Sequence, residues 1–272
     1  MRITTIAALG ILATLGGGCA SRPTTNSGGA PAAASGSSAM VEQNSTTKMQ
    51  QAASINLQLG VAYMQTGNLQ VAEQKLLKAQ DENPHDPQIH SALALLYVRI
   101  GNDAKANAEY KESLRLAPGD PDVLNSYGVY LCGKGRTDEG VKYFTQAAQN
   151  PLYRTPWAAY TNAGLCMHDA KRIPESEQFF LRAVSFKPNF EPAVVQLGMV
   201  EIEQQHPADA ARLVREYLAI GAASADVLMV GWRAAQLQGD QEASARYAKR
   251  LQSDYPTTDQ AHAVADASSG QK

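Results

Sequence analysis

The sequence has few aromatic and few charged side chains. Aromatic residues make up 7% of the chain and charged residues 18%, and the formal net charge is -2. Because the net charge is so small, the whole molecule has no field that would attract nucleic acid or an anionic membrane surface. Alanine, glutamine and leucine are plentiful instead, which favours a core of helix packed on helix over one built on a sheet.

Motifs of catalysis and of metal binding are also missing. The sequence contains no G-x-S-x-G, no phosphate-cradling glycine loop and no H-E-x-x-H. Its five histidines lack metal-ligand spacing. Cys166 and His168 are only two positions apart, a separation that does not bring side chains together on a helix. We therefore predict a protein that is not an enzyme and that needs no cofactor, metal or small-molecule substrate.

The amino terminus has the layout of an export signal. Arg2 precedes an apolar run over residues 6–15, which is too short to span a bilayer comfortably, and small residues lead into Cys19. This arrangement resembles a bacterial lipobox, in which the cysteine is acylated and the signal, here residues 1–18, is removed. Gly16 departs from that pattern, which favours leucine. The alternative is an ordinary signal peptide that is cut nearby, with an incidental cysteine.

The residues after the cysteine suggest a destination and a tether. Ala20 stands where enteric-type lipoproteins of the inner membrane carry aspartate, so the resemblance implies an outer-membrane lipoprotein that faces the periplasm. Several acyl chains on Cys19 would make the anchoring stable. Residues 19–52 are rich in alanine, glycine, serine and threonine and have little to bury, which predicts a disordered tether.

From residue 53 the chain repeats with a period of 34 residues. The recurring pairs are Tyr63 and Gly67, Tyr97 and Gly101, and Leu131 and Gly135. This is the pattern of the tetratricopeptide repeat (TPR), in which each unit is a helical hairpin and stacked units bury a common core. We predict an all-α fold, a right-handed superhelix of six TPR helix-turn-helix repeats. The predicted units are residues 53–86, 87–120, 121–156, 157–190, 191–224 and 225–258, followed by a tail over residues 259–272.

Glycine, aspartate and proline mark the ends of the predicted helices. Asp86-Pro87 and Asp120-Pro121 place a capping carboxylate just before proline at the first helical position. Glycines follow the first helix of several hairpins, where we expect a left-handed backbone conformation. These glycines are Gly67, Gly101, Gly135 and Gly239.

Helical position predicts which side chains line the inner surface formed by the first helix of each hairpin. Apolar and amide side chains at these positions suit an extended or helical peptide. The alternative is that some of them pack between neighbouring first helices. The predicted partner-binding residues are Leu57, Gln58, Val61, Met64, Leu95, Arg99, Asn125 and Asn162.

Cys132 and Cys166 lie late in the first helices of the third and fourth units, at nearly equivalent positions. Because neighbouring first helices lie side by side, the two thiols can face each other, and an oxidising periplasm would favour a disulfide. The alternatives are two buried free thiols, or Cα atoms too far apart for the bond.

The chain resembles the type IV pilus biogenesis and stability lipoproteins, the PilF/PilW family. The resemblance is strongest over NSYGVYLC at residues 125–132, NPLY at 150–153 and AYTNAGLC at 159–166. It implies a pilotin that binds the secretin subunit of the pilus, carries it to the outer membrane by the lipid on Cys19, and promotes its multimerisation. We expect a monomer. The alternative is a periplasmic TPR scaffold lipoprotein for another envelope assembly, either outer-membrane protein insertion or the regulation of peptidoglycan enzymes.

Overall fold

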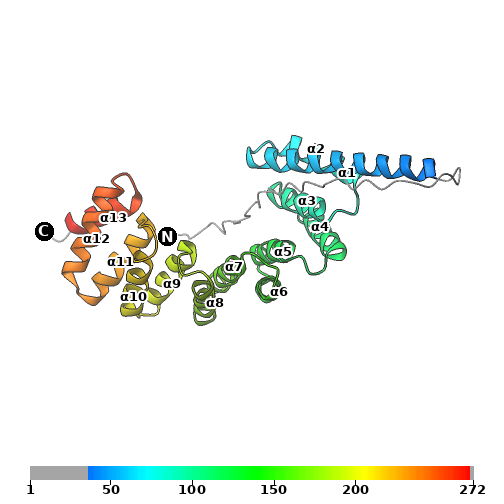
Figure 1. Ribbon diagram of the computed structural model, residues 1–272. Coiled ribbons are helices and arrows are strands. Elements are labelled where there is room, and N and C mark those ends of the chain that lie inside the picture. The colour runs from blue at the N-terminus through cyan, green and yellow to red at the C-terminus, as the bar shows by residue number, and fades with distance from the viewer. Residues whose placement is uncertain (1–35, 270–272) are drawn as a thin grey trace, which may run out of the picture. The chain divides into compact units, whose positions relative to one another are not determined.

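The computed structural model describes the backbone of residues 36–269 and the side chains of residues 47–267. All regular elements in this range are α-helices (Figure 1), so the predicted all-α repeat fold is confirmed. The helices are α1 (Gly36–Gln65), α2 (Leu69–Glu82), α3 (Pro87–Arg99), α4 (Asp103–Leu116), α5 (Pro121–Gly133), α6 (Thr137–Gln149), α7 (Pro156–Asp169), α8 (Ile173–Phe186), α9 (Glu191–Glu203), α10 (Pro207–Leu218), α11 (Ala225–Gln238), α12 (Gln241–Asp254) and α13 (Asp259–Ser269).

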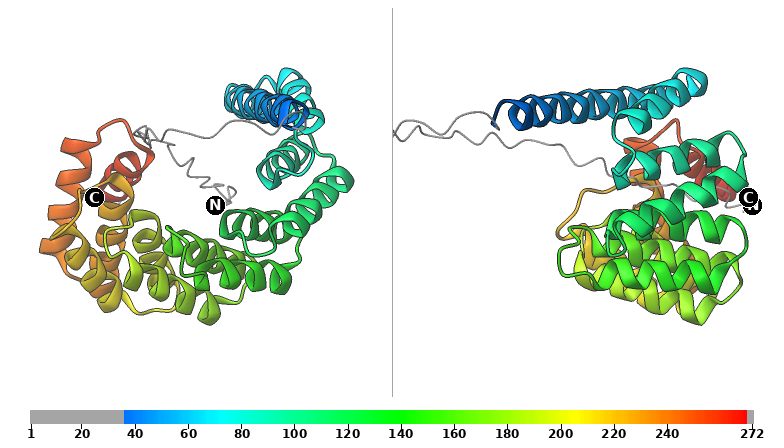
Figure 2. Two further views of the ribbon diagram at one scale, coloured as in Figure 1. Left: turned by 45° about the vertical axis from the view of Figure 1, so that its right-hand side comes forward. Right: turned by 90° about the vertical axis from the view of Figure 1, so that its right-hand side faces the viewer.

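Helices that follow one another in the chain pack against each other. The two helices of each hairpin are joined by a short turn, as in α1 and α2 or α7 and α8, and the second helix then packs on the first helix of the next hairpin, as α8 does on α9. The helices belong to two compact units, which divide within α5 between Ser126 and Tyr127. Within the second unit, Figure 2 shows α7 to α13 as a row of successive helices.

A left-handed residue lies at the turn of each hairpin. In four hairpins this residue is the predicted glycine, with φ of +79° at Gly67, +75° at Gly101, +72° at Gly135 and +71° at Gly239. In the other two it is Lys171 (φ 63°) and Gln205 (φ 65°). A side chain in this conformation costs roughly 1 kcal/mol. The same turn hydrogen bond forms nonetheless, from Arg172 N to Met167 O at 2.9 Å, because packing of the two helices fixes the turn.

The predicted aspartate caps are confirmed. Asp86 Oδ1 accepts a hydrogen bond from Gln88 N at 2.9 Å, at the start of α3. Asp120 Oδ1 accepts from Asp122 N at 2.9 Å, at the start of α5. Each carboxylate thereby satisfies a backbone donor that has no partner within the helix.

The predicted tether is wrong for residues 36–52, because α1 begins at Gly36. Residues 37–59 contain neither glycine nor proline, and the carboxyl-terminal half of α1 packs on α2. Extending such a fixed helix adds one hydrogen bond for each residue ordered, without a new nucleation cost. Residues 1–35, which include the predicted signal, Cys19 and the start of the tether, lie outside the described residues.

The carboxyl-terminal tail contains a short helix that covers the last hairpin. Ala261 and Val264 of α13 are 3% and 0% exposed. They pack in one cluster with Leu228 of α11 and Leu251 of α12, both of which are fully buried. The apolar face that would end the row of hairpins is thus closed. No helix in the described part of the chain is both long and apolar enough to cross a membrane.

Candidate protein-binding surface

Five of the predicted partner-binding residues are exposed or half-buried, and they lie on α1 and α3. Leu57, Val61 and Leu95 are half-buried, and Gln58 is exposed. Arg99 is also exposed, but its guanidinium Nη1 donates a hydrogen bond to Met64 O at 2.7 Å. This bond places a cation at the carboxyl end of α1, where the helix dipole is negative. Arg99 therefore already has a structural role between the two helices.

The other three predicted residues are buried. Met64 is 3% exposed, Asn125 8% and Asn162 4%, so these side chains have little surface to offer a partner. For these three residues the alternative interpretation, packing between helices, is the one that fits. In the case of Asn162, α7 is covered by α6, α8 and α9, and most of its residues are buried.

The apolar surface of α1 lies on a different face from the predicted one. Ile55 is 58% exposed and Leu59 39% exposed, and Ala62 beside them is also exposed. The three residues are spaced by four and three positions, so they form one stripe on the helix. We call this stripe the open face of α1.

Equivalent positions in later hairpins are buried. Those matching Ile55 in α3, α7, α9 and α11 are Ile89, Ala159, Ala193 and Val227, all 0% exposed. Those matching Leu59 in α3, α7 and α9 are Leu93, Ala163 and Leu197, at 0%, 0% and 3%. On each of these four helices packs the second helix of the preceding hairpin, which buries these positions.

The open face is exposed because, among the described helices, only α2 and α3 pack on α1, and neither of them covers this stripe. The sequence alone could have indicated this exposed stripe. Apolar residues stand in α1 at repeat positions that are core in every other unit, namely Ile55, Leu59 and Ala62. Our sequence-based prediction assigned binding to the inner surface and did not single out these three residues. The candidate site is therefore an exposed apolar stripe on α1. It is equivalent to the helix face that is covered by a second helix in later hairpins, so a helix of a partner could pack on it.

A disulfide joins Cys132 of α5 to Cys166 of α7, with the two Cα atoms 5.7 Å apart. The bond links the first helices of two successive hairpins and closes a segment with a sequence separation of 34 residues. Such a link typically stabilises the folded state by about 2–4 kcal/mol. Gly140 of α6 lies against it, since a Cβ there would collide with Cys132 Sγ and come within 2.9 Å of Gly128 O.

The described side chains form no group of three or more histidine, cysteine, aspartate or glutamate residues that could hold a metal ion. His168 contacts Glu203 at 3.0 Å, and His206 contacts the buried Glu201 at 3.4 Å. Burial, followed by the nearby Glu177 and Asp209 carboxylates, raises the pKa of Glu201. These pairs belong to the structure of the hairpins.

Comparisons with known proteins agree with this architecture. The family model described as tetratricopeptide repeat matches residues 46–87 and 57–121. The type IV pilus assembly protein PilF of Pseudomonas aeruginosa is 25% identical over 206 residues, covering 76% of this chain and 82% of PilF. Its solved structure aligns with a TM-score of 0.65 at 24% identity, covering 81% of this chain and 99% of the PilF chain.

Two further proteins extend the comparison. The crystal structure of PilW, described as a widely conserved type IV pilus biogenesis factor, aligns with a TM-score of 0.64 at 26% identity, covering 79% of this chain and 98% of PilW. An uncharacterized protein of Haemophilus influenzae is 30% identical over 129 residues, covering 47% of this chain and 72% of that protein.

The helical hairpins, their turns and the matched repeat model define a TPR protein, a class whose stacked hairpins bind other proteins. Within that class, the comparisons support a type IV pilus TPR protein that is similar to PilF and PilW.

Proposed function

We propose that this protein is an outer-membrane pilotin lipoprotein. In this proposal it binds the secretin subunit of the type IV pilus, and it promotes localisation of the secretin to the outer membrane and its multimerisation there. The observation that carries the proposal is the likeness to PilF over most of both chains, since PilF is named as a type IV pilus assembly protein. Neither binding nor delivery needs catalysis or a cofactor, so the protein would not be an enzyme.

The proposed membrane anchor is the acylated thiol of Cys19. Its support is the short apolar run that precedes the cysteine and the small residues between them. One acyl chain gives only marginal binding to a bilayer, whereas two or more anchor a protein stably. The lipid would therefore fix the destination of the complex, while the hairpins would hold the secretin.

The proposed binding surface for the secretin is the open face of α1. An amphipathic helix of the secretin would lie on Ile55, Leu59 and Ala62, in the position that a preceding second helix has in later hairpins. Support for a helical partner comes from α3, α7, α9 and α11, where the equivalent residues are buried beneath such a helix. Burying the exposed part of these side chains would contribute about 25 cal/mol for each Å² of apolar surface removed from water.

The proposal is tested by deleting the gene in the source bacterium and measuring detergent-resistant secretin multimers in outer-membrane fractions. We expect the multimers to disappear in the deletion strain and to return when the unaltered gene is supplied. A strain that produces the Cys19→Ala variant should retain secretin binding in pull-downs but should leave the secretin mislocalised.

Normal multimers in the deletion strain would rule out the pilotin assignment. They would instead favour a TPR scaffold that serves another envelope assembly. If the multimers disappear but the Cys19→Ala strain is normal, secretin binding stands and delivery through the lipid is wrong.

A further inference from the structure

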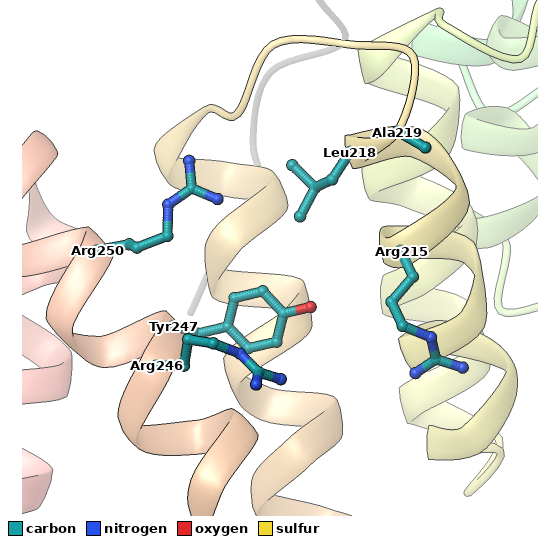
Figure 3. Close-up of a pocket in the computed structure, with 6 residues that line it drawn as sticks. All are labelled: Arg215, Leu218, Ala219, Arg246, Tyr247 and Arg250. Atoms are coloured by element: carbon teal, nitrogen blue, oxygen red, sulfur yellow. The ribbon is translucent and has the colours of Figure 1, made fainter.

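A cavity of about 380 Å³ lies between α10 and α12, well apart in sequence from the open face of α1. Within the described residues, α10 and α12 do not pack on each other, although both pack on α11. The gap between them is therefore lined by side chains from two neighbouring second helices. These side chains are Arg215, Leu218 and Ala219 of α10 and Arg246, Tyr247 and Arg250 of α12 (Figure 3).

Three of the six lining residues are arginines. Arg246 and Arg250 are four positions apart on α12, so they lie one turn apart on the same side of the helix. Arg215 stands on α10, at the opposite wall (Figure 3). A guanidinium carries its charge at every physiological pH and presents donors that match the geometry of a carboxylate.

The existing partners of these arginines are weak or absent. Arg246 contacts Glu242 at 3.4 Å and Arg250 contacts Asp254 at 3.5 Å, and all four side chains are well exposed. Such surface pairs contribute about 0–1 kcal/mol, so a ligand can replace them at little cost. The side chain of Arg215 forms no hydrogen bond or ion pair with any described residue.

The remaining lining residues make the cavity amphipathic. The ring of Tyr247 packs over Gly231 of α11, where an added Cβ would lie 2.7 Å from Tyr247 Cζ. Its hydroxyl is directed toward α10 in Figure 3 and forms no hydrogen bond with a described residue. Leu218 and Ala219 add apolar surface at the end of α10, and the neighbouring Ile220 is 61% exposed. The cavity thus offers an apolar wall beside charged donors.

We propose that this cavity binds an acidic segment of a protein partner. A carboxylate of the segment would accept hydrogen bonds from Arg215 on one wall and from Arg246 or Arg250 on the other. An adjacent apolar side chain would lie on Leu218 and the ring of Tyr247. A protein segment fits better than a free phosphate. Phosphate would accept hydrogen bonds from the arginines but would make no contact with the apolar surface of Leu218 and Tyr247. This site is independent of the secretin proposal, which concerns α1.

The proposal is tested by fluorescence anisotropy with a labelled decapeptide that repeats a glycine-leucine-glutamate unit three times and ends in glycine. The matched neutral peptide carries glutamine in place of each glutamate. We expect the acidic peptide to bind the unaltered protein and the neutral peptide to bind at least tenfold more weakly. The Arg215→Gln and Arg246→Gln variants should each lose about tenfold in affinity, because each removes a charge-assisted contact. A double variant that combines Arg215→Gln and Arg246→Gln should bind more weakly still, and higher salt should weaken binding to the unaltered protein more than binding to this double variant.

The matched control is Arg212→Gln. Arg212 is an exposed arginine on α10 that pairs with Asp209 and Glu216 and does not line the cavity. Its replacement should leave the affinity for the peptide unchanged, and circular dichroism should show that all variants remain folded. Equal affinity of the double variant and the unaltered protein would overturn the proposal. So would equal binding of the two peptides, or binding of phosphatidylglycerol vesicles through these arginines without any binding of the acidic peptide.

Discussion

His90 is a buried histidine whose hydrogen-bond partners favour its charged form. It is 4% exposed, its Nδ1 lies 2.7 Å from Glu109 Oε2, and its Nε2 lies 2.9 Å from Pro84 O. Carboxylate and carbonyl oxygens are both acceptors, so this arrangement favours a ring that is protonated on both nitrogens. The hydrogen bond to Glu109 raises the pKa of His90 above its ordinary 6.5, with further support from Pro84 O and Glu112, and this outweighs the opposing effect of burial.

Because the folded-state pKa of His90 is raised, its contribution to stability is fully present below about pH 6.5 and is lost as the pH rises through the folded-state pKa. We predict that Glu109→Gln lowers the free energy of unfolding by about 1.5–3 kcal/mol near pH 6. It should also flatten the fall in stability toward higher pH, as measured by urea unfolding. Glu242→Gln, which removes an exposed pair with Arg246, is the control. Equal pH dependence in the unaltered protein and Glu109→Gln would contradict this account.

Helix α1 has no second helix of a preceding hairpin packed on it among the described residues, whereas α3, α7, α9 and α11 each have one. Its residues Ile55 and Leu59 face solvent, whereas Ile89 and Leu93 at the same positions of α3 are fully buried. A stripe that is core in one hairpin and surface in another has the composition of a surface that a partner's helix can cover, which is the basis of the proposed secretin site.

We predict that replacing Ile55 and Leu59 together by aspartate abolishes secretin binding in pull-downs from detergent-solubilised membranes. The two side chains are exposed, so the melting temperature should change little. The control is Leu237→Asp, which changes an exposed leucine on α11 (51% exposed). Unchanged secretin binding by the α1 variant would mean that the secretin binds elsewhere on the hairpins.

Local features of the helices were predictable from the sequence, whereas surfaces were only partly so. The turn glycines and the capping Asp86 follow from backbone geometry, and the pairing of Cys132 with Cys166 agrees with their nearly equivalent positions. Whether Asn162 is buried depends on how closely α7 is covered by its neighbours, which the repeat pattern does not specify. The cavity at Arg215 arises because α10 and α12 stand apart, a distance that no sequence motif encodes.

The first and the last described hairpins differ in whether their outer apolar face is covered. The first hairpin leaves the open face of α1 exposed, whereas the last hairpin is covered by α13. Repeat proteins require such a terminal cap for solubility, because the outer hairpin would otherwise expose its core face to water.

The cap can be tested by changing one residue of α13. Val264→Asp places a carboxylate in a fully buried position between α11 and α12, which should cost about 2–4 kcal/mol and detach α13. We predict a lower melting temperature, by about 2–4 °C for each kcal/mol, together with concentration-dependent association through the exposed Leu228 and Leu251. Ala265→Asp, at an exposed position of the same helix, should leave both properties unchanged. If the two variants have the same melting temperature and Val264→Asp does not associate at high protein concentration, α13 is not the cap. The last hairpin is then stable without it.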